Sequence, residues 1–304
     1  MSARAVLVTG PTRGLGREVV SQLVDRRLCD VLLLVGRPGP ALEETRQAAA
    51  AGGGIEVISV AADLSSMDEV RAAARSVVEE LDRRDRKLDV VALNAALQFD
   101  NATTTTVDGF EATFAIGLLA NHALLDALRS HLDSAAHVVV VGSGTHYGDF
   151  PATLLVPGPK WRPSTELARP WTDENASTPR AGRRAYSTMK LGVNYLATGW
   201  KQRLGTVRVN VYDPGLMPGT GLVRTGGWQQ VVWNRVMPAL TILPGVTTPQ
   251  RSSRCFADLL VGETFPTLDG GYVEIGRIKA ASAESNNSAR VEELMKTCDE
   301  LSRA

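Results

Sequence analysis

Short apolar runs recur along this chain, and stretches with apolar residues at three- and four-residue spacing separate them. Such alternation is typical of a parallel sheet whose two faces are both covered by helices. We predict seven strands, at residues 3–9, 31–35, 55–60, 90–93, 138–141, 207–212 and 272–275. The helical patterns fall at residues 14–28, 41–51, 67–83, 107–132, 185–204 and 249–260.

Successive strand–helix–strand units wind with a right-handed crossover, so the pattern predicts a single α/β domain with a Rossmann-type, doubly wound sheet. We assign residues 1–277 to this domain. Two segments interrupt the rhythm: a Pro- and Trp-rich insertion at 145–184 and a Gly- and Trp-containing segment at 216–248, which we interpret as a lid. Residues 278–304 form a polar C-terminal tail, weakly helical at 289–301, to which we assign no chemistry.

The charge balance, the length of the apolar runs and the cysteine content argue against a nucleic-acid-binding or membrane-spanning protein. Basic and acidic residues both number 33, so no basic field is expected to hold nucleic acid or an anionic membrane. The longest apolar runs are far shorter than the roughly 20 residues of a membrane helix. Three scattered cysteines and no signal peptide lead us to expect a soluble, cytoplasmic protein. The histidines lack metal-type spacing, so we predict no metal site.

A glycine-rich turn joins the first predicted strand to the first predicted helix. In this position, glycines allow the backbone to approach a pyrophosphate and bring the helix N-terminus to it. Because the glycines lie directly between a predicted strand and a predicted helix, they favour a dinucleotide-binding motif over a plain strand-to-helix turn. We therefore predict a dinucleotide site at this turn, whose residues are Gly10, Pro11, Thr12, Arg13, Gly14, Leu15 and Gly16.

Residues at the ends of the following strands favour NADP(H) over NAD(H). An NAD site usually places an acidic residue at the end of the second strand, but this chain has Gly36 and Arg37 there. Arg37 and Arg13 could both flank a 2′-phosphate. Asp63 and Leu64 follow the third strand, where Asp63 could bind the adenine amino group or cap a helix. Asn94, followed by Ala95, ends the fourth strand, and we expect it to tie neighbouring backbone together beneath the cofactor.

Tyr186 and Lys190 lie four residues apart in a predicted helix, so their side chains project from the same face. An ammonium beside a phenol favours the ionised phenol. We therefore expect Lys190 to lower the pKa of Tyr186 from its reference value of about 10, toward the range of a working general acid.

In order along the chain, these motifs match one family. The sequence resembles the short-chain dehydrogenases/reductases over residues 3–275, through the Gly10–Gly16 turn, Asp63, Asn94-Ala95-Ala96, Gly142-Ser143, the Tyr186/Lys190 pair and Pro214-Gly215. The Val35-Gly36-Arg37 strand end and the long insertion are similar to the branch that contains retinol dehydrogenases and protochlorophyllide reductases.

The resemblance implies an NADPH-dependent oxidoreductase that transfers hydride between nicotinamide and a ketone or secondary alcohol. Tyr186 would donate the proton to the carbonyl oxygen, Ser143 would orient that oxygen, and Lys190 would bind the nicotinamide ribose. Pro214 and Gly215 would shape the backbone beside the nicotinamide, and Thr220 would contact its carboxamide. The partner is thus a small molecule.

One position departs from the family. The family commonly has a catalytic Asn after a Phe-x-x pattern, and this chain has Gly117 after Phe114. That Asn holds a water linking Lys to solvent. Gly117 could leave room for an extra water, or Asn121, one turn later, could reach back toward it.

Two other functions remain open. The chain could be an NADP-binding sensor or scaffold whose chemistry has decayed. It could reduce a C=C bond, although no cysteine lies between Ser143 and Gly215, where protochlorophyllide reductases use one. For a ketoreductase, the insertion indicates a bulky substrate, with His146 and Tyr147 as candidate contacts. Helices 107–132 and 185–204 form the dimer contact in many members, whereas insert-bearing members are often monomers, so we expect a homodimer or a monomer.

Overall fold

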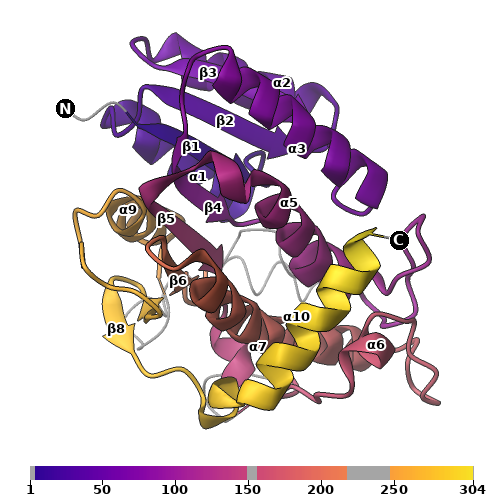
Figure 1. The fold of residues 1–304 in the computed structure, drawn as a ribbon. Coiled ribbons are helices and arrows are strands. Elements are labelled where there is room, and N and C mark those ends of the chain that lie inside the picture. Colours follow the sequence, from indigo (N-terminus) through magenta and orange to yellow (C-terminus); the bar gives the residue numbers. More distant parts are fainter. Residues whose placement is uncertain (1–3, 149–155, 218–246, 304) are drawn as a thin grey trace.

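The computed structural model describes residues 4–148, 156–217 and 247–303 and contains an eight-stranded sheet (Figure 1). The strand order is β3-β2-β1-β4-β5-β6-β7-β8. The order reverses between β1 and β4, which is the topology of a doubly wound sheet. The strands are β1 (Ala5–Thr9), β2 (Val31–Gly36), β3 (Glu56–Ala61), β4 (Leu88–Leu93), β5 (Leu132–Val141), β6 (Arg208–Asp213), β7 (Tyr272–Glu274) and β8 (Arg277–Lys279).

The seven predicted strands are confirmed and run parallel, from β3 at one edge to β7. The eighth strand, β8, was missed. It pairs antiparallel with β7, and its three residues are all exposed. An exposed three-residue strand carries no apolar pattern, because neither of its faces contributes to the core.

Helices cover both faces of the sheet, as the sequence predicts, and a separate apolar core lies beneath each face. One face carries α1 (Gly14–Asp25), α2 (Pro40–Ala51) and α9 (Pro249–Leu260). The opposite face carries α3 (Met67–Asp82), α5 (Ala120–Leu128) and α7 (Pro179–Leu204). The first turns of α7 belong to the segment predicted as insertion, because Pro179 at the start of the helix and the Thr178 cap initiate it early.

The helix predicted at 107–132 is shorter and interrupted. Its first residues form a turn in which Val107 is 82% exposed, and the helix begins with α4 (Ala112–Phe114). The Glu111 carboxylate caps this start by accepting a hydrogen bond from the Phe114 amide at 2.7 Å. A π-helical turn, η1 (Ala115–Leu119), then leads into α5, and Leu132 already begins β5. The predicted helix end was therefore wrong at Leu132.

The C-terminal segment, predicted to be weakly helical at 289–301, forms a helix, α10 (Ser288–Arg303), which crosses α5 and α7 in Figure 1. Leu294, Met295 and Cys298 are buried in the same core as α7. A side chain at Gly199 of α7 would collide with Met295, so this glycine allows the close packing of the two helices. The helices expected to form a dimer contact are thus covered, over this part, by the chain's own C-terminal helix.

The insertion is largely irregular where the structure describes it, with two short helices, η3 (Gly144–Tyr147) and α6 (Ser164–Leu167). Its residues 149–155 lie outside the described residues. The predicted lid lies mostly outside them as well, from 218 to 246.

Candidate active site

The glycine turn lies at the carboxyl end of β1, against β2 and β4. Gly10 and Gly14 have φ values of +64° and +53°, which side chains rarely adopt. A side chain at Gly16 would collide with the Gly10 carbonyl oxygen, so this glycine allows α1 to begin directly at the sheet edge. Arg13 precedes the helix, and its side chain makes no capping hydrogen bond. The geometry fits the binding of a pyrophosphate at a helix N-terminus.

Asn94 ties β4 to this turn, as the sequence predicts. Its side-chain amide donates to the carbonyl oxygens of Thr9, at 2.9 Å, and Gly10, at 3.1 Å. In return, the Thr9 hydroxyl accepts hydrogen bonds from the backbone amides of Asn94 and Ala95, each at 3.0 Å. The backbone beneath the predicted pyrophosphate is therefore fixed from two strands.

The other predicted cofactor residues lie at the carboxyl ends of β2 and β3. Arg37 is exposed directly after β2. Asp63 follows β3, and its Oδ1 accepts hydrogen bonds from the amide and hydroxyl of Ser65, at 2.9 and 2.8 Å. The helix cap considered for Asp63 is instead Ser66, whose hydroxyl accepts from the Glu69 amide. Leu64 and Leu15 are buried, and Thr12 is half-buried.

Ser143, Tyr186 and Lys190 come together beyond β5. Ser143 follows this strand, and α7 carries the other two side chains, which are 5% and 2% exposed. The Lys190 ammonium donates a 2.7 Å hydrogen bond to the Val141 carbonyl oxygen and lies 5.5 Å from the centre of the Tyr186 ring. A side-chain hydrogen bond between Ser143 and Tyr186 joins the two predicted oxygen-binding groups and lowers the pKa of Tyr186.

The expected effect of Lys190 on Tyr186 is not seen. Burial, followed by the negative charge of Asp213, raises the pKa of Tyr186, and only its hydrogen bond to Ser143 lowers it. Burial also lowers the pKa of Lys190 to about 8, against the opposing effect of Asp213. The spacing of the two residues indicates a neighbouring charge but not the desolvation of either group. At neutral pH Tyr186 therefore holds its proton.

The space beside Gly117 is filled by protein. A side chain at this position would collide with the Met189 side chain, so the extra water that we considered has no room there. The second alternative is seen: the Asn121 side-chain amide donates to the Gly117 carbonyl oxygen at 2.8 Å. This bond lies across the π-helical turn. The Asn121 Oδ1 is buried without a hydrogen-bond partner among the described residues.

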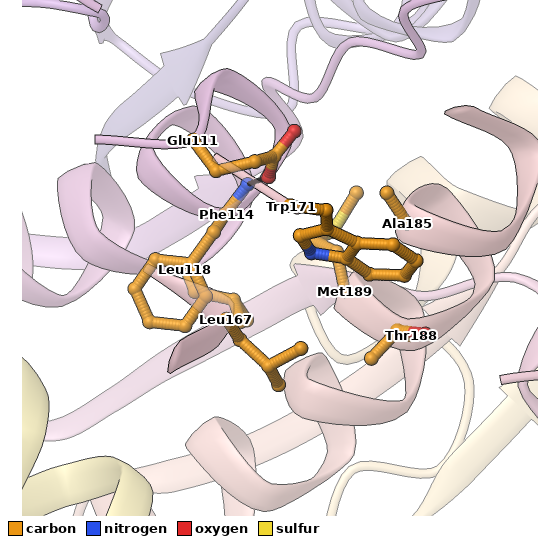
Figure 2. A pocket seen from close by; sticks show the side chains of 8 residues that line it. All are labelled: Glu111, Phe114, Leu118, Leu167, Trp171, Ala185, Thr188 and Met189. Atoms are coloured by element: carbon orange, nitrogen blue, oxygen red, sulfur yellow. Dashed lines mark hydrogen bonds between the residues drawn. The ribbon is translucent and has the colours of Figure 1, made fainter. Parts of the chain in front are cut away.

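Beside Met189 lies a cavity of about 10 Å³, about the size that holds one water molecule. Figure 2 shows Glu111, Trp171 and Met189 around it, on different elements. Glu111 is buried, and burial raises its pKa to about 7. The lining is otherwise mostly apolar, and the space is too small for a substrate.

His146 and Tyr147, the candidate substrate contacts, are bound to the protein. The His146 Nδ1 lies 2.7 Å from the Ser143 carbonyl oxygen, and its Nε2 accepts a 3.2 Å hydrogen bond from the Ser282 amide. The Tyr147 hydroxyl donates to the Ala280 carbonyl oxygen at 2.6 Å. These contacts tie the loop after β5 to the segment after β8, so the arrangement favours a structural role for both.

The turn at Pro214 and Gly215 follows β6, and Gly215 has a φ of +70°. Asp213, which the sequence argument passed over, accepts hydrogen bonds from the Gly215 amide at 2.9 Å and the Tyr272 hydroxyl at 2.6 Å. The available signal was an acidic residue at the end of a strand predicted to be buried. Thr220 lies outside the described residues.

Within the described part of the chain, no group of three or more His, Cys, Asp or Glu side chains is arranged to hold a metal ion. Among the same residues, no helix combines the length and apolar character needed to span a bilayer.

The first half of the chain is similar to a known protein family. The model of the short chain dehydrogenase family matches residues 4–153. Human retinol dehydrogenase 14 is 33% identical over 167 residues, covering 49% of this chain and 48% of the relative. Hydroxynaphthalene reductase arp2 of Aspergillus fumigatus is 26% identical over 159 residues, covering 52% and 54%. These matches span about half the length of the curated relatives.

The fold extends the likeness over nearly the whole chain. The crystal structure of NADPH-bound carbonyl reductase from chicken fatty liver superposes with a TM-score of 0.61 at 18% identity, covering 92% of this chain and 100% of that one.

Proposed function

We propose that the chain is an NADPH-dependent reductase of bulky ketones in the short-chain dehydrogenase/reductase family, whose model matches residues 4–153. The observation that carries the proposal is the meeting of Ser143, Tyr186 and Lys190 at the carboxyl edge of the sheet. The same edge carries the Gly10–Gly16 turn, on the far side of β4. A cofactor held at the turn would therefore have its reactive end near these three side chains.

The protonation states of the site favour reduction. Burial and Asp213 raise the pKa of Tyr186, so the phenol is protonated at neutral pH and can give its proton to a carbonyl oxygen. Ser143 would orient this oxygen, and Lys190 would hold the nicotinamide ribose. A cofactor held there would supply the hydride, and Tyr186 the proton, that convert the ketone to a secondary alcohol.

NADP(H) is the proposed cofactor because Arg37 is exposed at the end of β2 and no carboxylate occupies that strand end. A guanidinium there can bind a 2′-phosphate with two parallel hydrogen bonds. Arg13, exposed in the glycine turn, is the second candidate. The NADPH-bound carbonyl reductase of the same fold is consistent with this choice.

The bulky substrate rests on the long segment between Ser143 and Tyr186 and on relatives that are named for retinol and hydroxynaphthalene. A panel of aromatic and polycyclic ketones with NADPH tests the proposal, by the consumption of NADPH and by identification of the alcohol. Reduction by the wild type and its loss in Tyr186→Phe are expected. Binding of NADPH with no turnover across the panel would favour the sensor or scaffold function instead.

A further inference from the structure

Asp213 is buried in the candidate active site but takes no part in the proposed proton and hydride transfer. We propose that Asp213 is a positioning residue that keeps Lys190 in its ammonium form and fixes the Pro214-Gly215 turn beside the nicotinamide. The inference rests on the proposed reductase function, because it concerns the same site. It adds a residue that the family's motifs leave out of the Ser143, Tyr186 and Lys190 group.

The strand geometry directs Asp213 toward Lys190. Successive side chains of a strand point to opposite faces. The Tyr212 ring stacks on Phe256 of α9, with centroids 4.7 Å apart, so its neighbour Asp213 faces the side of the sheet that carries α7. Tyr212 is in register with Val141 on the adjacent strand, whose carbonyl oxygen accepts from Lys190. The carboxylate and the ammonium therefore lie near the same ends of β5 and β6.

Asp213 is held in this place from two sides. Its Oδ2 accepts from the Tyr272 hydroxyl on β7, and its Oδ1 accepts from the Gly215 amide in the following turn. Asp213 and Lys190 are each 2% exposed. One side chain thus connects the strand next to β6 with the turn that would border the nicotinamide, on the face of the sheet that carries α7.

Burial raises the pKa of Asp213, and Lys190 is the cation that opposes this shift. Tyr186 and Lys190 face it from α7, Tyr272 and Glu274 from β7, and Tyr147 from η3. His146 packs on Tyr272, and burial lowers its pKa, so it is neutral at physiological pH. Lys190 is therefore the one cation in this group of described residues. A buried charge is costly unless an opposite charge accompanies it.

The negative charge of Asp213 determines the direction in which it shifts the pKa values of Lys190 and Tyr186. Burial lowers the pKa of Lys190, and the Asp213 carboxylate opposes that shift. The same carboxylate adds to the effect of burial in raising the pKa of Tyr186. Ketone reduction needs the proton on both groups. Removal of the Asp213 charge should therefore lower both pKa values and move the alkaline limit of the reaction to lower pH.

Asp213→Asn tests this with little change of shape. The amide oxygen can still accept from Gly215, and the amide nitrogen can donate to the Tyr272 hydroxyl. We expect the alkaline midpoint of kcat/KM for ketone reduction to fall by roughly one pH unit, because loss of an opposite charge lowers the pKa of a buried ammonium. Glu274→Gln is the matched control: Glu274 lies opposite Asp213 on β7, and its loss should leave the midpoint in place.

A second readout needs no turnover. The pH dependence of NADPH binding, followed by fluorescence, should show the same downward shift, because the Lys190 ammonium would bind the ribose. If the wild type binds NADPH but reduces no ketone, a shift in binding supports the role of Asp213 while the proposed function fails. Equal midpoints for wild type and a folded Asp213→Asn in both measurements overturn the inference. If Asp213→Asn does not fold, Asp213→Ser removes the same charge with less volume, and the same shift is expected.

Discussion

The Met189 side chain occupies the space in which a side chain on Gly117 would lie. Gly117 stands where the family commonly has its catalytic Asn, and Asn121 donates to the Gly117 carbonyl oxygen from one turn later. The site thus differs from the family pattern by two linked features, a glycine and the methionine that fills its place. We therefore expect an Asn side chain at position 117 to fit only if the Met189 side chain moves or is replaced.

Gly117→Asn should destabilise the protein by about 1–3 kcal/mol, because the new side chain overpacks the core against Met189. Adding Met189→Ala should recover part of that loss, although Met189→Ala alone leaves a cavity. Denaturant unfolding of the two single variants and the double variant gives the coupling free energy. Additive losses in the cycle would show that the two positions do not share the space.

Arg37→Ala should lower kcat/KM for NADPH about 10- to 100-fold and leave that for NADH nearly unchanged, because it removes a charge-assisted hydrogen bond worth roughly 1.5–3 kcal/mol. Arg83→Ala is the matched control, since Arg83 is an exposed arginine at the end of α3, paired with Glu80. Initial rates with both cofactors provide the measurement. An equal loss with NADPH and NADH would mean that Arg37 does not contact the 2′-phosphate.

The rate of ketone reduction should fall as pH rises through about 8, the value to which burial lowers the pKa of Lys190. The ammonium is present below this pH and is lost above it, and Tyr186 titrates higher because its pKa is raised. The pH profile of kcat/KM for NADPH reports these groups in the free enzyme. A profile that stays level well above this pH would exclude Lys190 as the titrating group.

Leu294→Ala should lower the free energy of unfolding by about 2–5 kcal/mol, the usual cost of emptying a core leucine site. Leu294 is fully buried where α10 meets the α7 core, so the C-terminal helix should unfold with the domain. Leu301→Ala, nearer the end of the same helix and half-buried, should cost less. A Leu294→Ala variant as stable as wild type would indicate that α10 is not part of the folding unit.

The parallel strands were predictable because burial on both faces leaves continuous apolar runs such as 31–35 and 138–141. The glycine turn was predictable because Gly10, Gly14 and Gly16 each meet a local backbone requirement. Strand β8 could not be predicted, because an exposed edge strand has no run of apolar residues.

The electrostatics of the site were less accessible from sequence. Tyr186/Lys190 spacing indicates that the side chains are neighbours, but the pKa of each depends on burial and on Asp213, which the fold brings from another strand. Likewise, Met189 and Gly117 lie on two helices that are distant in sequence, so the sequence pattern of either helix does not predict their contact.

We propose that Tyr186 gives the proton in an NADPH-dependent ketone reduction. Tyr186→Phe should lower kcat about 10²- to 10⁴-fold, the usual contribution of general acid catalysis, with NADPH binding retained. Tyr195→Phe, which removes a buried hydroxyl from the same helix, should keep nearly full activity. NADPH consumption with a ketone that the wild type reduces is the measurement. Undiminished turnover by Tyr186→Phe would mean that Tyr186 is not the proton donor.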